Sequence, residues 1–151
     1  MKTKLVQEHL IQNGCTVINY VGTKIMVDIF YNQSMYERFL EGLDCRQGMG
    51  MYGSEQELDF NQIPDEKMVV VQENGNHVKT YKFTTLFKAT MSFKERREDG
   101  KLYTRNLTFG IRKNIFGSDF NLVIANKNTH FSSLEEIKQF LKEKYGDYTI
   151  I

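Results

Sequence analysis

The sequence has no tryptophan, one proline and two cysteines, and its opposite charges almost cancel. Cys15 and Cys45 have neither a second pair nor CxxC spacing, which excludes a disulfide framework and the usual kind of zinc site. A net charge of +1 excludes a polyanion mimic and a uniformly basic coat. No apolar run approaches the roughly 20 residues that a membrane-spanning helix needs, so we expect no membrane partner.

The first residues do not have the pattern of a secretory signal, because Gln7, Glu8 and His9 interrupt their apolar stretch. We therefore expect a cytoplasmic protein. In that compartment both cysteines would be reduced thiols, with Cys15 packed on a strand.

What is present is the composition of an ordinary globular protein. Hydrophobic residues make up 40% of the 151 residues and charged residues 26%, and 11 phenylalanines and 8 tyrosines supply large side chains for a core. The length fits one domain, and the chain has no internal repeat, linker or low-complexity stretch. The sequence therefore predicts a single domain over residues 1–151.

Turn and capping signals predict the elements of the first half. Residues 3–13 favour a short helix before Gly14, and residues 15–21 and 24–31 favour the two strands of a hairpin. Ser34 with Glu37 forms a capping box, which predicts a helix from there to about residue 44. Residues 44–67 hold three glycines and the proline, so we expect a long loop there, with a second capping pattern at 54–57.

The strongest pattern is an alternation between residues 79 and 112. Apolar residues occupy odd positions and polar or basic residues occupy even ones, which predicts two long strands with one face on a core and one in water. The odd, inward-facing positions are Tyr81, Phe83, Phe87, Ala89, Met91 and Phe93 on the first strand, and Tyr103, Leu107, Phe109 and Ile111 on the second.

The turn between these strands, Glu98-Asp99-Gly100, decides their register. A two-residue turn would pair odd positions with even ones and so expose aromatic side chains or bury polar groups. A three-residue loop with Gly100 in the left-handed conformation pairs Met91 with Leu107 instead. We therefore expect the three-residue loop.

The remaining signals complete the expected fold. Strands are predicted at 68–72 and from Val78 onward, on either side of Asn74-Gly75, and at 120–125. Ser132 and Ser133 begin an amphipathic helix that ends at Gly146. The fold class that follows is α+β, a mainly antiparallel sheet of an N-terminal hairpin and a four-strand meander, covered by two to three helices.

No catalytic, cofactor or metal motif has the context that would support it. Residues 48–53 match G-x-G-x-x-G, but a dinucleotide loop lies between a strand and a helix, and here a helix precedes it. His9, His77 and His130 lack metal-ligand spacing. We therefore expect no cofactor, no metal and no catalytic residue. An enzyme whose site is assembled from distant residues stays an alternative.

The charges are distributed unevenly along the chain. Residues 37–73 hold nine acidic and three basic residues, whereas residues 79–113 hold ten basic and three acidic ones. The expected register puts Lys82, Lys88, Lys94, Arg96 and Arg112 on the solvent face of the hairpin and Arg97, Lys101 and Arg105 near its tip.

Three interpretations of this basic surface compete. It is a solvated face paired with the acidic segment, a ribbon that binds nucleic-acid phosphates, or a protein-binding surface that uses charge to orient a partner. The alternation buries the aromatic residues, so the stacking platform of single-strand binders is missing.

Protein binding is the interpretation that we favour. Met49, Met51 and Tyr52 in the long loop would supply apolar anchors, since methionine suits an adaptable contact surface. The size, the single proline and the richness in Lys, Asn and Ile are similar in style to small accessory or inhibitor proteins of low-GC bacteria and their phages. This likeness implies a non-catalytic inhibitor of a host or defence factor. Nucleic-acid binding through the basic hairpin 79–113 is the alternative.

Overall fold

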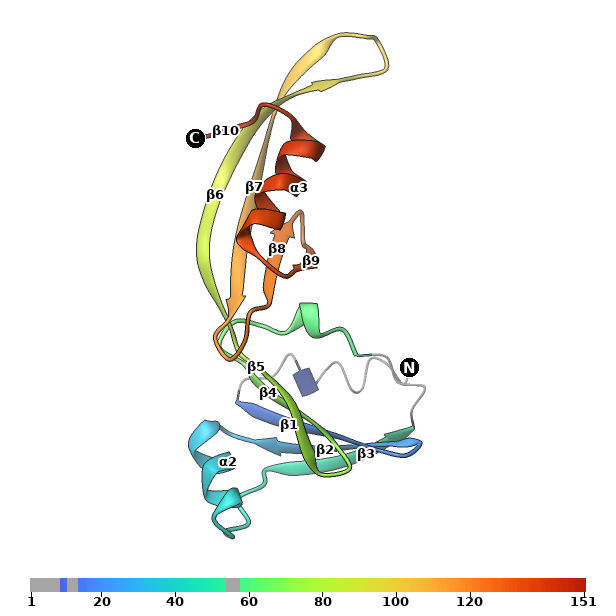
Figure 1. The fold of residues 1–151 in the computed structure, drawn as a ribbon, viewed down its shortest axis with the longest axis vertical. Helices are drawn as coiled ribbons and strands as arrows, with labels where there is room; N and C mark the ends of the chain where they lie inside the picture. The colour runs from blue at the N-terminus through green and yellow to red at the C-terminus, as the bar shows by residue number, and fades with distance from the viewer. Residues whose placement is uncertain (1–8, 11–13, 54–57) are drawn as a thin grey trace. The chain divides into compact units, whose positions relative to one another are not determined.

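The chain, described for residues 9–10, 14–53 and 58–151 by a computed structural model, divides into two compact units. The first comprises Met1–Phe83 and Ile115–Gly117, and the second comprises Thr84–Asn114 and Ser118–Ile151. Each unit contains one five-stranded sheet (Figure 1). The α+β class is confirmed in broad terms, but the single helix-covered sheet is wrong, because the strands form two sheets. The expectation of a single domain stays a prediction.

The first sheet has the strand order β3-β2-β1-β4-β5. Its strands are β1 (Cys15–Val21), β2 (Lys24–Phe30), β3 (Gly48–Gly53), β4 (Met68–Glu73) and β5 (Asn76–Tyr81). The two expected turns are confirmed, since Gly22 has a φ of 57° and Asn74 and Gly75 have φ of 50° and 81°. The sequence did not predict that β1 and β4 pair in parallel, which requires the chain to return through α2 and β3.

Both faces of this sheet bury side chains. One face contributes Ile18, Ile25, Val27 and Val69 to a core cluster. On the other face, Phe30 and its neighbours pack against helix α2 (Gln33–Leu40). A strand buried on both faces reads as a continuous apolar run, which is why the three valines of β4 left its register ambiguous in the sequence.

Helix α2 begins and ends earlier than its capping box indicated. The N-cap is Asn32, whose side-chain oxygen accepts a hydrogen bond of 2.9 Å from the backbone N–H of Met35, and the last helical residue is Leu40. The expected start at Ser34 is therefore wrong. Asn and Ser are comparable N-caps, so the sequence offered two starts two residues apart.

Two other expectations concern segments that are only partly described. The predicted helix 3–13 lies mostly outside the described residues. Within it, the structure describes His9 and the fully buried Leu10, and both are helical. The capping pattern at 54–57 lies outside them entirely. The long loop expected over 44–67 is wrong, because the chain there contains β3 and a 3-10 helix, η1 (Phe60–Gln62).

The second sheet has the order β10-β6-β7-β8-β9. Its strands are β6 (Phe83–Arg96), β7 (Leu102–Asn114), β8 (Phe120–Ile124), β9 (Lys127–Phe131) and the short β10 (Thr149–Ile150). The alternation that suggested one strand from residue 79 onward is divided at Lys82, with β5 in the first sheet and β6 in the second. The expected meander is therefore shared between two sheets.

The long hairpin of β6 and β7 has the expected turn. Gly100 has a φ of 79°, and the backbone N–H of Arg97 donates to the carbonyl oxygen of Lys101 at 3.1 Å, which closes a three-residue loop. The hydroxyl oxygens of Thr90 and Thr108 lie 3.2 Å apart, as the same register requires. The three-residue loop is confirmed.

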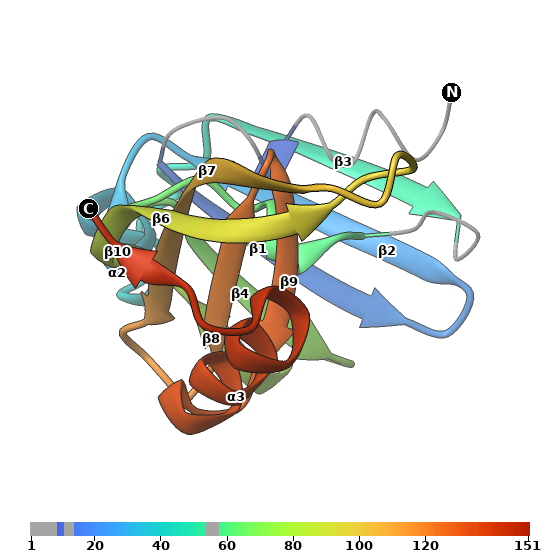
Figure 2. The same cartoon turned by 90° about the horizontal axis from the view of Figure 1, so that it is seen from above.

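Helix α3 (Leu134–Tyr145) covers the face of this sheet to which the odd positions of β6 and β7 point (Figure 2). It begins at Ser133, whose hydroxyl accepts a hydrogen bond from the N–H of Glu136, and it ends at Gly146, as expected. Ile137 and Leu141 of α3 pack with Met91 of β6 and other residues of the sheet. Among the described residues, no helix is long and apolar enough to span a bilayer.

The inward-facing residues of β6 are buried at two places. Phe83 is 1% exposed in the core cluster of the first unit, and the others that are buried lie in the cluster that α3 joins. Met91 is 0% and Phe93 7% exposed, and Ala89 is half-buried, as expected. Phe87 is 45% exposed, so its predicted burial is wrong. Its ring lies 5.8 Å from that of Phe109, but it lies outside the core cluster that α3 joins.

Candidate functional site

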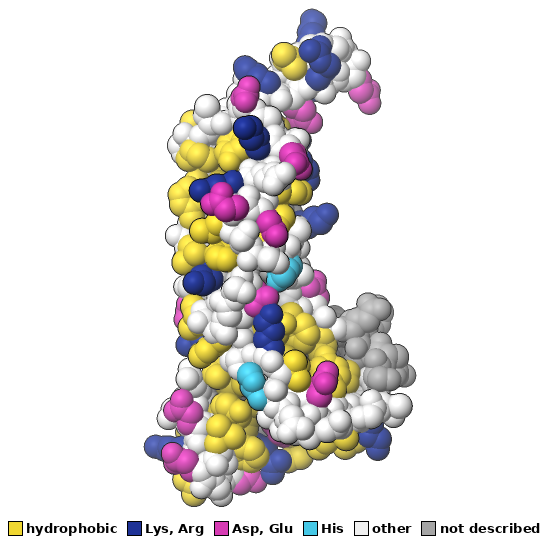
Figure 3. All heavy atoms as spheres, in the orientation of Figure 1, with side chains coloured by type: hydrophobic (Ala, Val, Ile, Leu, Met, Phe, Trp, Pro, Cys, Tyr) yellow, Lys and Arg dark blue, Asp and Glu magenta, His cyan; other side chains and the backbone are white. Residues whose placement is uncertain are grey.

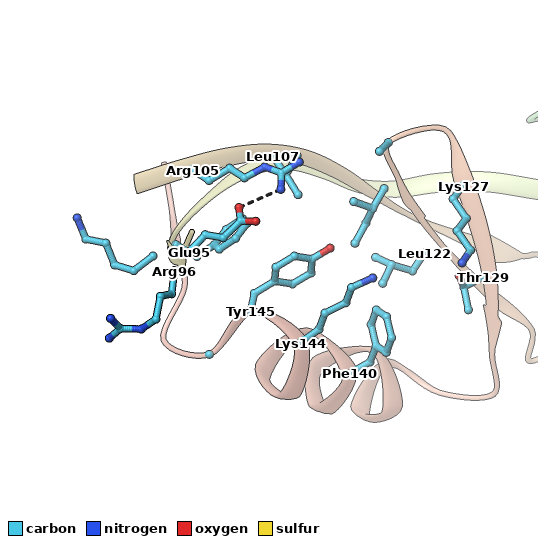
Figure 4. A pocket seen from close by; sticks show the side chains of 15 residues that line it. Glu95, Arg96, Arg105, Leu107, Leu122, Lys127, Thr129, Phe140, Lys144 and Tyr145 are labelled. Atoms are coloured by element: carbon cyan, nitrogen blue, oxygen red, sulfur yellow. Dashed lines mark hydrogen bonds and ion pairs between the residues drawn. The ribbon is translucent and has the colours of Figure 1, made fainter. Parts of the chain in front are cut away.

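A groove of about 910 Å³ lies in the second unit between α3 and the sheet (Figure 4). The sheet contributes apolar side chains from three strands, because the odd positions of β6 and β7 and the even positions of β8 point to this face. Helix α3 contributes two aromatic rings near its C-terminus. The apolar lining consists of Phe93, Leu107, Leu122, Ile124, Phe140 and Tyr145.

Cationic side chains border this apolar floor. Arg105 of β7 lies at one end and forms an ion pair of 2.9 Å with Glu95, the one acidic residue of the lining. Lys144 extends from α3 with its ammonium group 5.5 Å from the ring centre of Phe140, and Lys127 projects from β9 (Figure 4). Arg96 borders the groove but points away from it.

The groove resembles a contact surface more than an enclosed ligand pocket. Leu107, Phe140 and Tyr145 are all half-buried, so apolar area stays in contact with water. A pocket for a small molecule commonly encloses most of its ligand's surface. Here one side is open to solvent. In the view of Figure 3, hydrophobic side chains of the second unit are interspersed with both basic and acidic ones.

The basic residues of the hairpin do not share one face as expected. Lys88, Lys94 and Arg96 are exposed on the even-numbered face of β6, as predicted. Arg112 is 7% exposed, so its predicted exposure to solvent is wrong. Lys82 is half-buried and lies between β5 and β6, outside the hairpin.

At the hairpin tip, several cations are held by local contacts. The guanidinium of Arg97 lies 4.2 Å from the ring centre of Tyr103, and Arg96 donates a hydrogen bond to the carbonyl of Gly100. Lys101 is exposed, and its backbone N–H donates to Asp99. Hydrogen bonds from Tyr103 and from that N–H lower the pKa of Asp99. Arg105, expected near the tip with these residues, also lines the groove, which the alternation of β7 would have indicated.

The predicted apolar anchors lie on an edge strand of the first sheet. Met49 and Met51 of β3 are 64% and 57% exposed, and Met51 is paired across the ladder with Met26 of β2, which is 42% exposed. Met26 was not among the predicted anchors, although Lys24 and Asp28 on the same side of β2 are charged.

Tyr52, the third expected anchor, points to the face of β3 opposite the two methionines. It is half-buried and packs against the core cluster, with its hydroxyl 2.6 Å from Nε2 of His9. A Cβ on Gly50 would lie 3.1 Å from the Tyr52 ring. The Tyr52 ring therefore packs closely over this glycine.

Two buried polar clusters are the places where chemistry could occur. Nε2 of His130 lies 2.9 Å from the buried carboxylate of Asp119, which also accepts a hydrogen bond from Asn114. In the first unit, Nζ of buried Lys67 donates to Thr16 at 2.6 Å. The second contact places the Thr16 hydroxyl beside an amine, but Thr16 is 0% and Lys67 1% exposed, so neither group is open to a substrate. In the part of the chain that the structure describes, no three metal-ligating residues come together.

Comparison with family models, with curated proteins and with solved structures finds no match for this chain. A function for this chain is therefore inferred from its own surfaces.

Proposed function

We propose that the protein is a non-catalytic binding protein whose partner is another protein, in the manner of a small inhibitor or accessory factor of a phage or mobile element. The partner would place an acidic segment with large apolar side chains in the groove between α3 and the second sheet. The observation that supports this proposal is the combination of an apolar floor with cations on several sides of it.

The floor would supply most of the affinity. Burying apolar area contributes about 25 cal/mol per Å², and interface energy concentrates in a few well-packed anchors. Phe140 and Tyr145 on α3 face Leu122 across the groove, so an aromatic or aliphatic side chain of a partner would be enclosed between helix and sheet (Figure 4). Aromatic residues at the centre of a groove are typical of protein interfaces.

The cations would select the charge of the partner. The second unit carries twelve Lys and Arg residues against eight Asp and Glu residues, so an acidic segment is attracted from a distance and a basic one is repelled. Lys127 and Lys144 project from different elements toward one groove, so they can contact carboxylates spaced along a peptide.

A peptide selection tests this proposal without knowledge of the natural partner. A library of random peptides displayed on phage is selected against the immobilised full-length protein. We expect enrichment of peptides that combine Asp or Glu with large apolar residues. The double variant Lys127→Glu and Lys144→Glu should weaken their binding at least about tenfold, because two attractive contacts become repulsive.

The matched control is Lys142→Glu, which changes the same charge on the same helix at an exposed residue outside the groove lining. Its affinity for the selected peptides should stay within about threefold of wild type. Enrichment without acidic residues, or equal losses in the control and in the double variant, would contradict the proposal.

Nucleic-acid binding through the even-numbered face of the hairpin is the second candidate. It is favoured by the exposure of Lys88, Lys94 and Arg96 on one strand face, which matches contacts to a phosphate backbone. Reversing these three charges should abolish a mobility shift that weakens steeply with salt. The absence of any shift at low salt would remove this candidate.

A further inference from the structure

Strand β3 ends the first sheet without the features that normally protect a sheet edge. Among the described strands it pairs only with β2, so its outer backbone groups have no strand partner there. Its sequence, GMGMYG, has no charged residue and no proline, and Met49 and Met51 are exposed. An uncharged apolar edge is a template for pairing with another strand.

The opposite edge of the same sheet is protected. Strand β5 carries Lys79, and its ladder with β4 shifts register between Val71 and Gln72, which marks a β-bulge near Val78. Charges and bulges are the devices that discourage strand pairing at an edge. Of the two edge strands in the described part of this sheet, β5 therefore has these protective features and β3 has neither.

The sequence of β3 is complementary to itself. If two copies pair antiparallel about a two-fold axis at Gly50, Met49 of one copy lies opposite Met51 of the other, on the face that also holds Met26. No like charges meet in this arrangement, because the strand has none. Directly opposed side chains of an antiparallel pair lie about 5 Å apart, which suits the contact of two flexible methionines.

We propose that β3 is a self-association site, at which two copies of the chain join antiparallel, with Met49 of each opposite Met51 of the other, into one continuous sheet. A two-fold pairing uses the same surface on both copies and closes after two, so the product is a dimer and not a fibre. The site belongs to the first unit and is independent of the groove proposed for the acidic partner.

Analytical ultracentrifugation of the full chain over a wide range of concentrations tests the association. We expect a monomer–dimer equilibrium. Met51→Lys should raise the dimer dissociation constant at least about tenfold, because two lysines would enter an apolar strand pair. Val78→Lys makes the comparable change at the protected edge, where Val78 is 52% exposed, and it should leave the constant within about twofold of wild type.

Cross-linking tests the register without relying on a destabilised interface. In a Cys45→Ser background, chains carrying Met49→Cys are mixed with chains carrying Met51→Cys and oxidised. The mixed disulfide should form at least about fivefold faster than either homodimeric one, because only that pair is directly opposed. A monomer at every concentration, a dimer insensitive to Met51→Lys, or equal rates for the three disulfides would overturn the proposal.

Discussion

Replacing Lys67 by methionine is expected to stabilise the protein at neutral pH. Lys67 precedes β4 and is 1% exposed, and the one hydrogen bond of its ammonium group among the described residues is the 2.6 Å contact to Thr16. A buried ammonium group without a carboxylate partner is unfavourable. Burial accordingly lowers the pKa of Lys67 from 10.5 to about 8, with the nearby Cys15 thiol opposing the shift.

The size of the effect follows from that pKa. The difference between 10.5 and about 8 corresponds to about 3 kcal/mol of unfavourable charge burial, present in full when the lysine is protonated in both states. Methionine has a similar length and no charge, but its introduction removes a hydrogen bond worth about 1 kcal/mol. We therefore expect Lys67→Met to raise the free energy of unfolding by about 2 kcal/mol at pH 7.

The pH dependence gives the second half of this prediction. Below pH 8 both the folded and the unfolded protein carry the proton, so the wild type bears the whole cost. Between pH 8 and 10.5 the unfolded chain holds more of the proton than the folded one, so wild-type stability rises with pH. The advantage of Lys67→Met should shrink across this interval and be lost above it.

The difference between the two proteins is the quantity to follow. Burial raises the pKa of Cys15 to about 12, so its ionisation in the unfolded state lowers the stability of both proteins above pH 9. Unfolding by urea is followed by far-UV circular dichroism, because the chain has no tryptophan for fluorescence and its tyrosines ionise at high pH. Lys24→Met, at an exposed lysine of β2, is the control and should change stability by less than about 0.5 kcal/mol.

Two results would refute the reasoning. One is a variant no more stable than the wild type at pH 7, which would mean that the buried ammonium is compensated by its surroundings. The other is an advantage that stays constant between pH 8 and 10.5, which would mean that any gain comes from packing and not from charge.

Further predictions concern the thiols and the backbone. Cys15 is fully buried and has a pKa of about 12, whereas Cys45 is half-buried. A thiol reagent at pH 8 should therefore titrate one cysteine in the native protein and two in urea. Rapid reaction of both cysteines in the native protein would contradict the burial of Cys15. Gly14→Ala should destabilise the protein by more than about 2 kcal/mol in a thermal or urea titration, because φ is 108° and the added Cβ would lie 2.4 Å from the carbonyl oxygen of Phe30. An unchanged midpoint would show that the backbone relaxes there.

Local patterns in the sequence determined most of the elements. The strand from Phe83 onward, the turn at Gly100 and the cap at Ser133 each depend on residues close together in the chain, and all three are confirmed. β3 was missed because its three glycines are typical of a loop, and it is the ladder to β2 that makes this segment a strand.

What only the tertiary structure decided is which residues meet across the chain. A period of two identifies a strand but not its sheet, so the passage from β5 to β6 at Lys82 was invisible in the pattern. Contacts between distant segments also determine three other features. These are the burial of Arg112, the pairing of Met26 with Met51, and the groove between α3 and the sheet. Short-range chemistry specified the strands and turns, whereas long-range packing determined the surfaces available to a partner.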